Sequence, residues 1–260
     1  MKFNYVIIGS GPAGSVLAWK LAKLNFKVAL VDRSNSHKKI INDFFLPYVN
    51  STPSYYTPVF SDQLGGNSAL WHNKIYLISK KEFEKREWPI SYNELLEDSR
   101  DLSKILNVSK PKNLEKIEKD QNDEFDYHYS ERCKIGNIFD YLKINDNENI
   151  KVFENSSPVK INFDEHFNAK SIFIKNQKNK SNIELSFNKS LIFCAGGIGN
   201  PHLVLNLIPT ASNIVGRFLS DHPHVNITKI NSKEFKNYKK ILKSNIKNNI
   251  KNISESEKEE

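Results

Sequence analysis

Two short apolar runs enclose a helical pattern at the start of the chain. The first run, Phe3–Gly9, is rich in β-branched residues and ends in glycine, and the second, Lys27–Asp32, ends in an acid. Between them, apolar residues from Gly14 to Phe26 recur at the spacing of a helix. A strand, a helix and a strand within about 30 residues predict a βαβ unit, and therefore a parallel sheet.

The rest of the chain predicts two helices and further short strands. Tyr92–Leu106 is amphipathic, and Ser91 with Glu94 three residues later has the pattern of a capping box. His202–Leu207 is also expected to be helical. The further strands predict a small antiparallel β-meander in addition to the parallel sheet, and they are expected at Ile150–Phe153, Val159–Phe163, Ser171–Lys175, Glu184–Phe187 and Ser190–Ala195.

Composition agrees with a folded protein and excludes several classes. Hydrophobic residues make up 38% and aromatic residues 11% of the 260 residues, which is enough for a packed core. The 2 cysteines, Cys133 and Cys194, exclude a disulfide scaffold and a paired-cysteine zinc site, and we expect no bound metal. No apolar run approaches the roughly 18 residues of a membrane span, and Gly9 and Gly11 interrupt the N-terminal run, so we expect a cytoplasmic protein.

The net charge of +8 is unevenly distributed along the chain. Residues 229–254 contain 8 lysines and 1 acid, and the last six residues carry 4 acids and 1 lysine, which leaves +4 for the first 228 residues. We therefore expect a folded domain over residues 1–228, a low-complexity basic tail over residues 229–260, and no nucleic-acid partner. Isoleucines at helical spacing in the tail leave open a basic amphipathic helix that binds an anionic membrane or a partner.

Residues 9–14 have the G-x-G-x-x-G pattern of a dinucleotide-binding turn. Gly9 would permit the tight turn after the strand, Gly11 the approach of a pyrophosphate, and Gly14 close packing of helix on strand. Pro12 suits the first helical turn, whose free N–H groups attract phosphate. Asp32 lies 18 residues after Gly14, where an acid accepts hydrogen bonds from the ribose hydroxyls. These features predict a Rossmann-like α/β domain; the alternative is a glycine-rich turn in an unrelated sheet protein.

Four more segments follow the fingerprint (VIIGSGPAGS, Val6–Ser15): LGGNSALWHN (Leu64–Asn73), WPISYNELL (Trp88–Leu96), IFCAGGIGNP (Ile192–Pro201) and VGRFLSDHP (Val215–Pro223). In this order, the five segments resemble the glucose–methanol–choline (GMC) family of FAD-dependent oxidoreductases. The resemblance covers roughly residues 3–225 and implies FAD as cofactor. Some members attach FAD covalently through a histidine at the position of Leu70, so we expect non-covalent FAD here.

The resemblance also implies a set of cofactor-binding residues. The pyrophosphate would lie on Gly9, Ser10, Gly11, Pro12, Ala13 and Gly14, the ribose on Asp32, and the flavin ring beside Leu64, Gly65, Gly66, Asn67 and Ser68. Val159 would contact adenine, Ala195 and Gly196 would lie beside the pyrophosphate, and Asp221 and His222 would approach the flavin. The alternatives are a plain turn at Gly65–Ser68, a plain strand valine at Val159 and a capped turn at Asp221–His222.

The implied reaction is the oxidation of a CH–OH group of a small alcohol or sugar, with hydride passing to flavin N5. In the GMC family the base is a histidine in the C-terminal region. We expect that region, and most of the substrate domain, to be missing, so no catalytic residue is assigned. His72 and His224 are candidates to test, and a second chain supplying the C-terminal half is the expected partner. The alternatives are a non-catalytic FAD- or nucleotide-binding remnant or module, and an interaction protein that docks through its tail.

Overall fold

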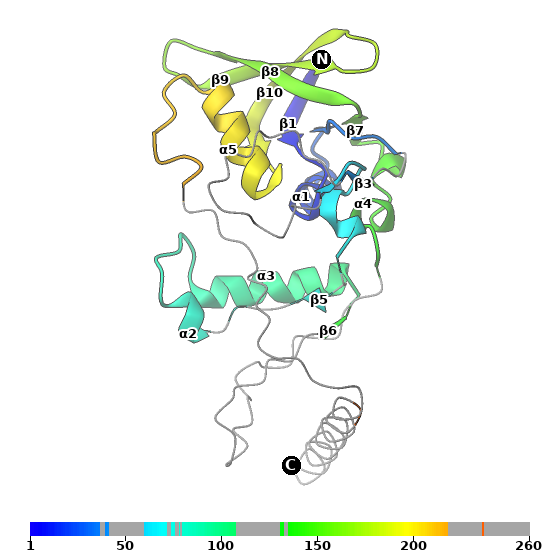
Figure 1. Ribbon diagram of the computed structural model, residues 1–260, viewed down its shortest axis with the longest axis vertical. Helices are drawn as coiled ribbons and strands as arrows, with labels where there is room; N and C mark the ends of the chain where they lie inside the picture. Colours follow the sequence, from blue (N-terminus) through cyan, green and yellow to red (C-terminus); the bar gives the residue numbers. More distant parts are fainter. Residues whose placement is uncertain are drawn as a thin grey trace. The chain divides into compact units, whose positions relative to one another are not determined.

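Six strands form one mixed sheet in the order β7-β2-β1-β10-β9-β8 (Figure 1). The computed structural model describes residues 1–36, 40–41, 60–71, 74–75, 78, 80–107, 131–132, 135–217 and 236. The six strands are β1 (Lys2–Ile8), β2 (Val28–Val31), β7 (Ile150–Phe153), β8 (Ser156–Phe163), β9 (Ala169–Asn176) and β10 (Asn182–Phe193). Two short pairs accompany them: β3 (Ile40–Ile41) with β4 (Phe60–Ser61), and β5 (Lys74–Ile75) with β6 (Glu131–Arg132).

The helices are α1 (Pro12–Lys23), α2 (Lys80–Phe83), α3 (Tyr92–Ile105), α4 (Ile138–Tyr141) and α5 (Gly196–Leu207), with 3₁₀ turns η1 (Gly66–Ala69) and η2 (Ile144–Asp146). The predicted βαβ unit is confirmed, because β1 pairs with β2 in parallel across α1. The helix begins at Pro12, which was expected in its first turn. It ends at Lys23 because Asn25 adopts a left-handed conformation with φ 62° and turns the chain towards β2.

Alternate residues of the parallel strands face two separate apolar cores. Ile7 and Leu30 belong to the first core, where α1 and α4 cover the sheet. Val6 and Val31 belong to the second core, which the β8–β9 hairpin and the end of α5 cover. This two-residue alternation is typical of strands that are buried on both faces.

β10 joins the parallel and antiparallel parts of the sheet. The sequence predicts two strands here, Glu184–Phe187 and Ser190–Ala195, and this division is wrong. One strand runs from Asn182 to Phe193, and its first half pairs antiparallel with β9 while its second half pairs parallel with β1. The polar pair Asn188–Lys189 interrupts the apolar pattern but only shifts the register against β1. The expected meander is therefore part of the same sheet as the Rossmann-like strands.

The helix predicted at Tyr92–Leu106 is confirmed as α3, with its capping box. The Ser91 hydroxyl accepts from Glu94 N at 3.2 Å, and Glu94 accepts from Ser91 N at 2.7 Å. These hydrogen bonds lower the pKa of Glu94, because they favour its ionised form. The helix predicted at His202–Leu207 begins earlier, at Gly196, although glycines and Pro201 are poor helix formers.

Met1–Arg217 forms one compact unit. The expected domain boundary at residue 228 and the basic tail lie outside the described residues, apart from Lys236. In the described ranges, no helix has the length and apolar character needed to cross a lipid bilayer.

Replacing Leu30 with alanine tests the first core. Leu30 in β2 is fully buried, so Leu30→Ala should lower the free energy of unfolding by about 2–5 kcal/mol. Leu24, at the end of α1, is 66% exposed and provides the matched control. Leu24→Ala should change stability by no more than about 0.5 kcal/mol. Urea unfolding followed by circular dichroism measures both values, and equal losses would contradict the assignment of this core.

Candidate functional site

The carboxyl ends of β1, β2 and β10 meet at the glycine-rich turn. Gly9 N donates to Val31 O at 2.8 Å, and Cys194 N donates to Ile8 O at 2.7 Å. Gly9 has a φ of +104°, and a Cβ at this position would overlap the carbonyl group of Cys194. Glycine is therefore required at residue 9 by both its conformation and the closeness of β10.

The other two glycines of the turn have different surroundings. A Cβ on Gly14 would overlap the carbonyl oxygen of Gly9, so Gly14 allows α1 to pack against the end of β1. A Cβ on Gly11 would meet no atom within 4 Å. Gly11 is the N-cap of α1, and the first N–H groups of that helix follow it. The fold requires glycine at residues 9 and 14, whereas the space beside Gly11 is open to a ligand.

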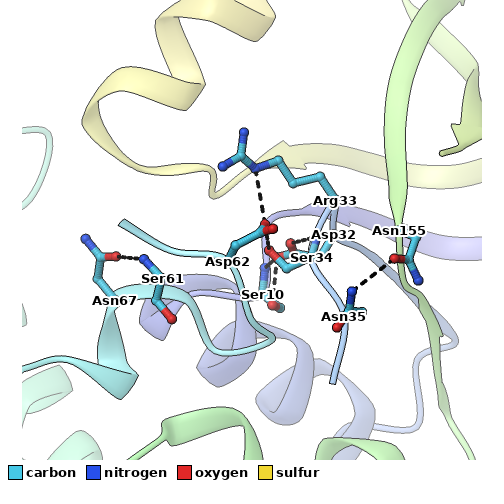
Figure 2. A network of polar contacts seen from close by, with 9 residues as sticks. All are labelled: Ser10, Asp32, Arg33, Ser34, Asn35, Ser61, Asp62, Asn67 and Asn155. Atoms are coloured by element: carbon cyan, nitrogen blue, oxygen red, sulfur yellow. Dashed lines mark hydrogen bonds and ion pairs between the residues drawn. The ribbon is translucent and has the colours of Figure 1, made fainter. Parts of the chain in front are cut away.

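Asp32 holds the end of β2 against the turn (Figure 2). Its Oδ2 accepts from Ser10 N at 2.6 Å and from Ser10 Oγ at 2.7 Å, and its Oδ1 accepts from Ser34 N at 2.8 Å. Its backbone N–H donates to Phe153 O at 3.0 Å, and its carbonyl accepts from Ser156 N at 2.8 Å. The carboxylate predicted to bind ribose is thus fixed in position by its own chain.

The glycine loop predicted at Leu64–Ser68 lies against the same turn. Gly65 N donates to the buried Ser10 Oγ at 3.0 Å, and a Cβ on Gly66 would come within 3.3 Å of Gly11 Cα. Gly65 has a φ of +88°, which favours glycine. The residues Gly66–Ala69 form the 3₁₀ turn η1. The loop therefore has a regular conformation and lies beside the dinucleotide-binding fingerprint.

Asn137 and Ser68 attach the glycine loop to α4. Asn137 Nδ2 donates to Leu64 O at 2.7 Å, while its Oδ1 accepts from Phe139 N at 3.0 Å as the N-cap of α4. Ser68 Oγ, also buried, donates to Gly65 O at 2.6 Å and accepts from Ile138 N at 3.1 Å. Sequence reasoning missed Asn137, although an asparagine directly before an apolar helical turn is an N-cap signal.

A polar group that the sequence did not predict lies beside Asp32 (Figure 2). Ser34 Oγ donates to Asp62 Oδ1 at 3.1 Å, and Arg33 Nε lies 3.9 Å from the same oxygen. Asp62 precedes the glycine loop, so this contact is a second connection between that loop and the end of β2. No sequence motif marks Asp62, because its role follows from the packing of two distant segments.

Ala195 and Gly196 follow β10 directly beside the turn. Ala195 Cα lies 3.0 Å from the position of a Cβ on Gly9, and Ala195 N donates to Asn200 Oδ1 at 2.7 Å. Gly196 has a φ of +79° and open space where its side chain would be. Burial raises the pKa of the neighbouring Cys194 thiol, so this group stays protonated at neutral pH.

The remaining predicted residues are not seen in contact with the glycine-rich turn, or lie outside the described residues. Val159 is 46% exposed and occupies an irregularity of β8 between Pro158 and Lys160, and no contact ties it to the turn. Leu70 directly follows η1, at its C-cap. Asp221, His222, His72 and His224 lie outside the described residues.

Alanine at residues 14 and 11 separates a glycine that the fold requires from one with open space beside it. Gly14→Ala should lower the free energy of unfolding by about 1–3 kcal/mol, because its Cβ overlaps backbone that cannot move freely. Gly11→Ala is the matched control and should change stability by no more than about 0.5 kcal/mol, since its Cβ enters open space. Thermal or urea unfolding compares the two variants. A larger loss at residue 11 than at residue 14 would refute this assignment.

Comparisons with known proteins agree with the geometry of the turn. Residues 7–37 match the family described as NAD(P)-binding Rossmann-like domain. Geranylgeranyl diphosphate reductase of Rhodobacter capsulatus is 40% identical over 55 residues, which cover 18% of this chain and 14% of the reductase.

Two solved structures of formate oxidase also resemble the chain. One is a crystal structure of formate oxidase, and the other is a variant of the Aspergillus oryzae enzyme studied for its FAD modification. Each has a TM-score of 0.49 and 14% identity, and the match covers 78% of this chain and 47% of the neighbour. The chain thus spans about half the length of these structures. The chain has a Rossmann-like α/β fold, and residues 7–37, which match the family model, contain the glycine-rich turn and Asp32.

Proposed function

We propose that this chain binds FAD without a covalent link and forms the cofactor-binding part of an oxidoreductase. One observation carries the proposal: the fingerprint turn, Asp32 and the glycine loop lie together at the carboxyl edge of the parallel strands. Ligands of doubly wound sheets bind at this edge. A dinucleotide site without flavin would need the turn and the acid, whereas the second glycine loop favours a flavin cofactor.

Each part of FAD has a proposed contact. The pyrophosphate lies beside Gly11 and the first N–H groups of α1, where the helix dipole favours negative charge. The ribose hydroxyls donate to Asp32, and the flavin ring lies beside the backbone of Gly65–Ser68. Gly196 offers a further approach to the pyrophosphate, and Val159 remains the proposed adenine contact.

The local structure fits such a ligand. The positions where Gly11 and Gly196 would carry side chains are open, in contrast to the filled positions beside Gly9 and Gly14. Within the described ranges, the buried hydroxyl of Ser61 has no hydrogen-bond partner. Ser61 N donates to Asn67 Oδ1 at 2.9 Å, so this hydroxyl lies on the segment that supports the glycine loop. A buried hydroxyl without a partner is costly, and this one lies next to the residues that hold the glycine loop.

Substitution at Gly11 tests the cofactor. The purified chain should bind FAD and show the absorption bands of an oxidised flavin. Gly11→Ala should fold normally and bind FAD at least about tenfold more weakly, because its methyl group occupies the space proposed for the pyrophosphate. Quenching of FAD fluorescence measures both affinities, and Leu24→Ala serves as the unaffected control. Equal FAD affinity of the Gly11 variant and the unaltered chain would count against the site.

The proposed reaction is the oxidation of a CH–OH group in a small alcohol or sugar. FAD supplies the hydride acceptor at N5, while a base takes the hydroxyl proton and a carbonyl product forms. The described histidines, His166 and His202, are exposed on the β8–β9 turn and on α5. Neither contacts the glycine loop, so we assign the base to a histidine outside the described residues or on a second chain.

The exposed edge of β10 supports a second chain as partner. In the part of the sheet that the structure describes, residues 188–193 pair with β1 on one side and have no ladder partner on the other. Leu191 and Phe193 on this stretch are partly exposed, whereas β2 is buried throughout. A polypeptide supplying the C-terminal half of the enzyme would cover this edge with a further strand.

The alternative function is a non-catalytic FAD-binding module, which the lack of a base among the described residues favours.

Dye reduction with a panel of alcohols and sugars separates these functions. The isolated chain should show flavin bands but little dye reduction, and coexpression with the reading frame directly downstream should give substrate-dependent reduction. Flavin bands without reduction in both preparations would favour the non-catalytic module. Robust turnover by the isolated chain would show that no second chain is needed.

A further inference from the structure

We infer that Ser10 is a positioning residue that connects the ribose-binding carboxylate of Asp32 to the backbone of the glycine loop. This inference rests on the proposed FAD-binding function and deepens it. Ser10 would set the distance between the site for the adenosine end of the cofactor and the site for the flavin ring. It occupies the second position of the G-x-G-x-x-G pattern, where the motif itself specifies no residue type.

The hydroxyl of Ser10 takes part in a chain of hydrogen bonds across three segments, and Figure 2 shows the link between Ser10 and Asp32. Ser10 Oγ donates to Asp32 Oδ2 at 2.7 Å and accepts from Gly65 N at 3.0 Å. The chain therefore runs from the backbone of the glycine loop, through the serine hydroxyl, to the carboxylate at the end of β2. Because the carboxylate is charged, its hydrogen bonds are stronger than those between neutral groups.

The surroundings of Ser10 leave its hydroxyl little freedom. Ser10 is fully buried, its N–H also donates to Asp32 Oδ2 at 2.6 Å, and its carbonyl accepts from Ser15 Oγ at 2.6 Å. One small oxygen thus has to donate and accept at the same time in an enclosed site. A hydroxyl meets this requirement, whereas alanine would leave Gly65 N–H and one acceptor position of Asp32 Oδ2 without partners.

The position of the glycine loop depends on the hydrogen bond from Gly65 N to Ser10 Oγ. Its contacts with Asn137 and Ile138 attach it to α4, which belongs to a different part of the chain from the turn. The bond from Gly65 N to Ser10 Oγ attaches it directly to the fingerprint. Gly66 also lies close to Gly11, so a small movement of the loop would change the space between the two segments. That space is the one that the pyrophosphate and the flavin would share.

The distribution of acceptors on Asp32 agrees with this role. Both hydrogen bonds from Ser10 go to Oδ2, and Ser34 N donates to Oδ1. A carboxylate oxygen can accept two hydrogen bonds, so Oδ1 retains capacity for a ribose hydroxyl while Oδ2 serves the protein. One carboxylate would then hold the ribose with one oxygen and position the glycine loop with the other.

The affinities of ADP and FAD distinguish positioning from general support of the turn. ADP contains the adenosine and pyrophosphate but no flavin. Ser10→Ala should weaken FAD binding about tenfold, as expected when a buried hydrogen bond is lost, and should weaken ADP binding by less than about threefold. The bound flavin of this variant should also show altered absorption bands, because the backbone beside the ring moves. Calorimetry or fluorescence quenching with the full chain measures both affinities.

Two further variants control for folding and chemistry. Ser10→Thr retains a hydroxyl and should keep the ratio of FAD to ADP affinity even if its added methyl group lowers stability. Ser103→Ala removes a hydroxyl that bonds within α3 and should change neither affinity. If Ser10→Ala does not fold, Ser10→Cys keeps an unbranched side chain but replaces the oxygen with a larger sulfur that is only a weak donor, and it should show the same selective loss.

Each outcome decides the inference. Equal losses of ADP and FAD affinity, or no loss of either, would overturn the positioning role while leaving FAD binding in place. An unaltered chain that binds ADP no more weakly than FAD would overturn the role as well, since the flavin would then gain nothing from the loop. An unaltered chain that binds neither compound would instead refute the proposed function.

Discussion

The hydrogen bonds of Asp32 hold together the segments on which the site depends. Its backbone bonds to Phe153 and Ser156 fix the end of β2 to the passage from β7 to β8. Its carboxylate accepts hydrogen bonds from Ser10, in the turn after β1, and from Ser34, in the segment that follows β2. The same carboxylate is the proposed ribose acceptor. The residue proposed to bind the ribose is thus also one that the fold needs, and its position is set by hydrogen bonds within the protein.

β10 transmits this arrangement to the rest of the sheet. Its parallel half places Cys194 and Ala195 against Gly9, and its antiparallel half pairs with β9 of the hairpin that covers the second core. A strand with two types of neighbour allows a chain of modest length to cover one face of the parallel sheet with strands instead of a helix. The parallel half of β10 pairs with β1 on one side only in the described structure, and its apolar residues Leu191 and Phe193 are partly exposed.

Features with a local cause were predictable from the sequence, and those with a distant cause were not. The βαβ unit, α3 with its capping box and the parallel sheet follow from apolar spacing and from residues a few positions apart. The continuity of β10 did not follow, because Asn188 and Lys189 resemble a turn unless the pairing with β1 is known. The start of α5 was missed because glycines and Pro201 disfavour a helix that the end of β10 nevertheless begins. Asp62 and Asn137 reach the glycine loop through tertiary contacts that no local pattern encodes.

The fingerprint turn shows why a motif understates the constraints on its residues. Its three glycines differ in their surroundings, because a side chain at Gly9 or Gly14 would overlap the backbone, whereas Gly11 has open space beside it. The residue between the first two glycines is written as unspecified, although Ser10 is fully buried and uses its N–H, its hydroxyl and its carbonyl in hydrogen bonds. In this chain, the unspecified position is therefore at least as constrained as Gly11. The motif specifies only the residues that dinucleotide-binding turns have in common. The contacts of Ser10 are specific to this chain, in which they connect Asp32 to the glycine loop.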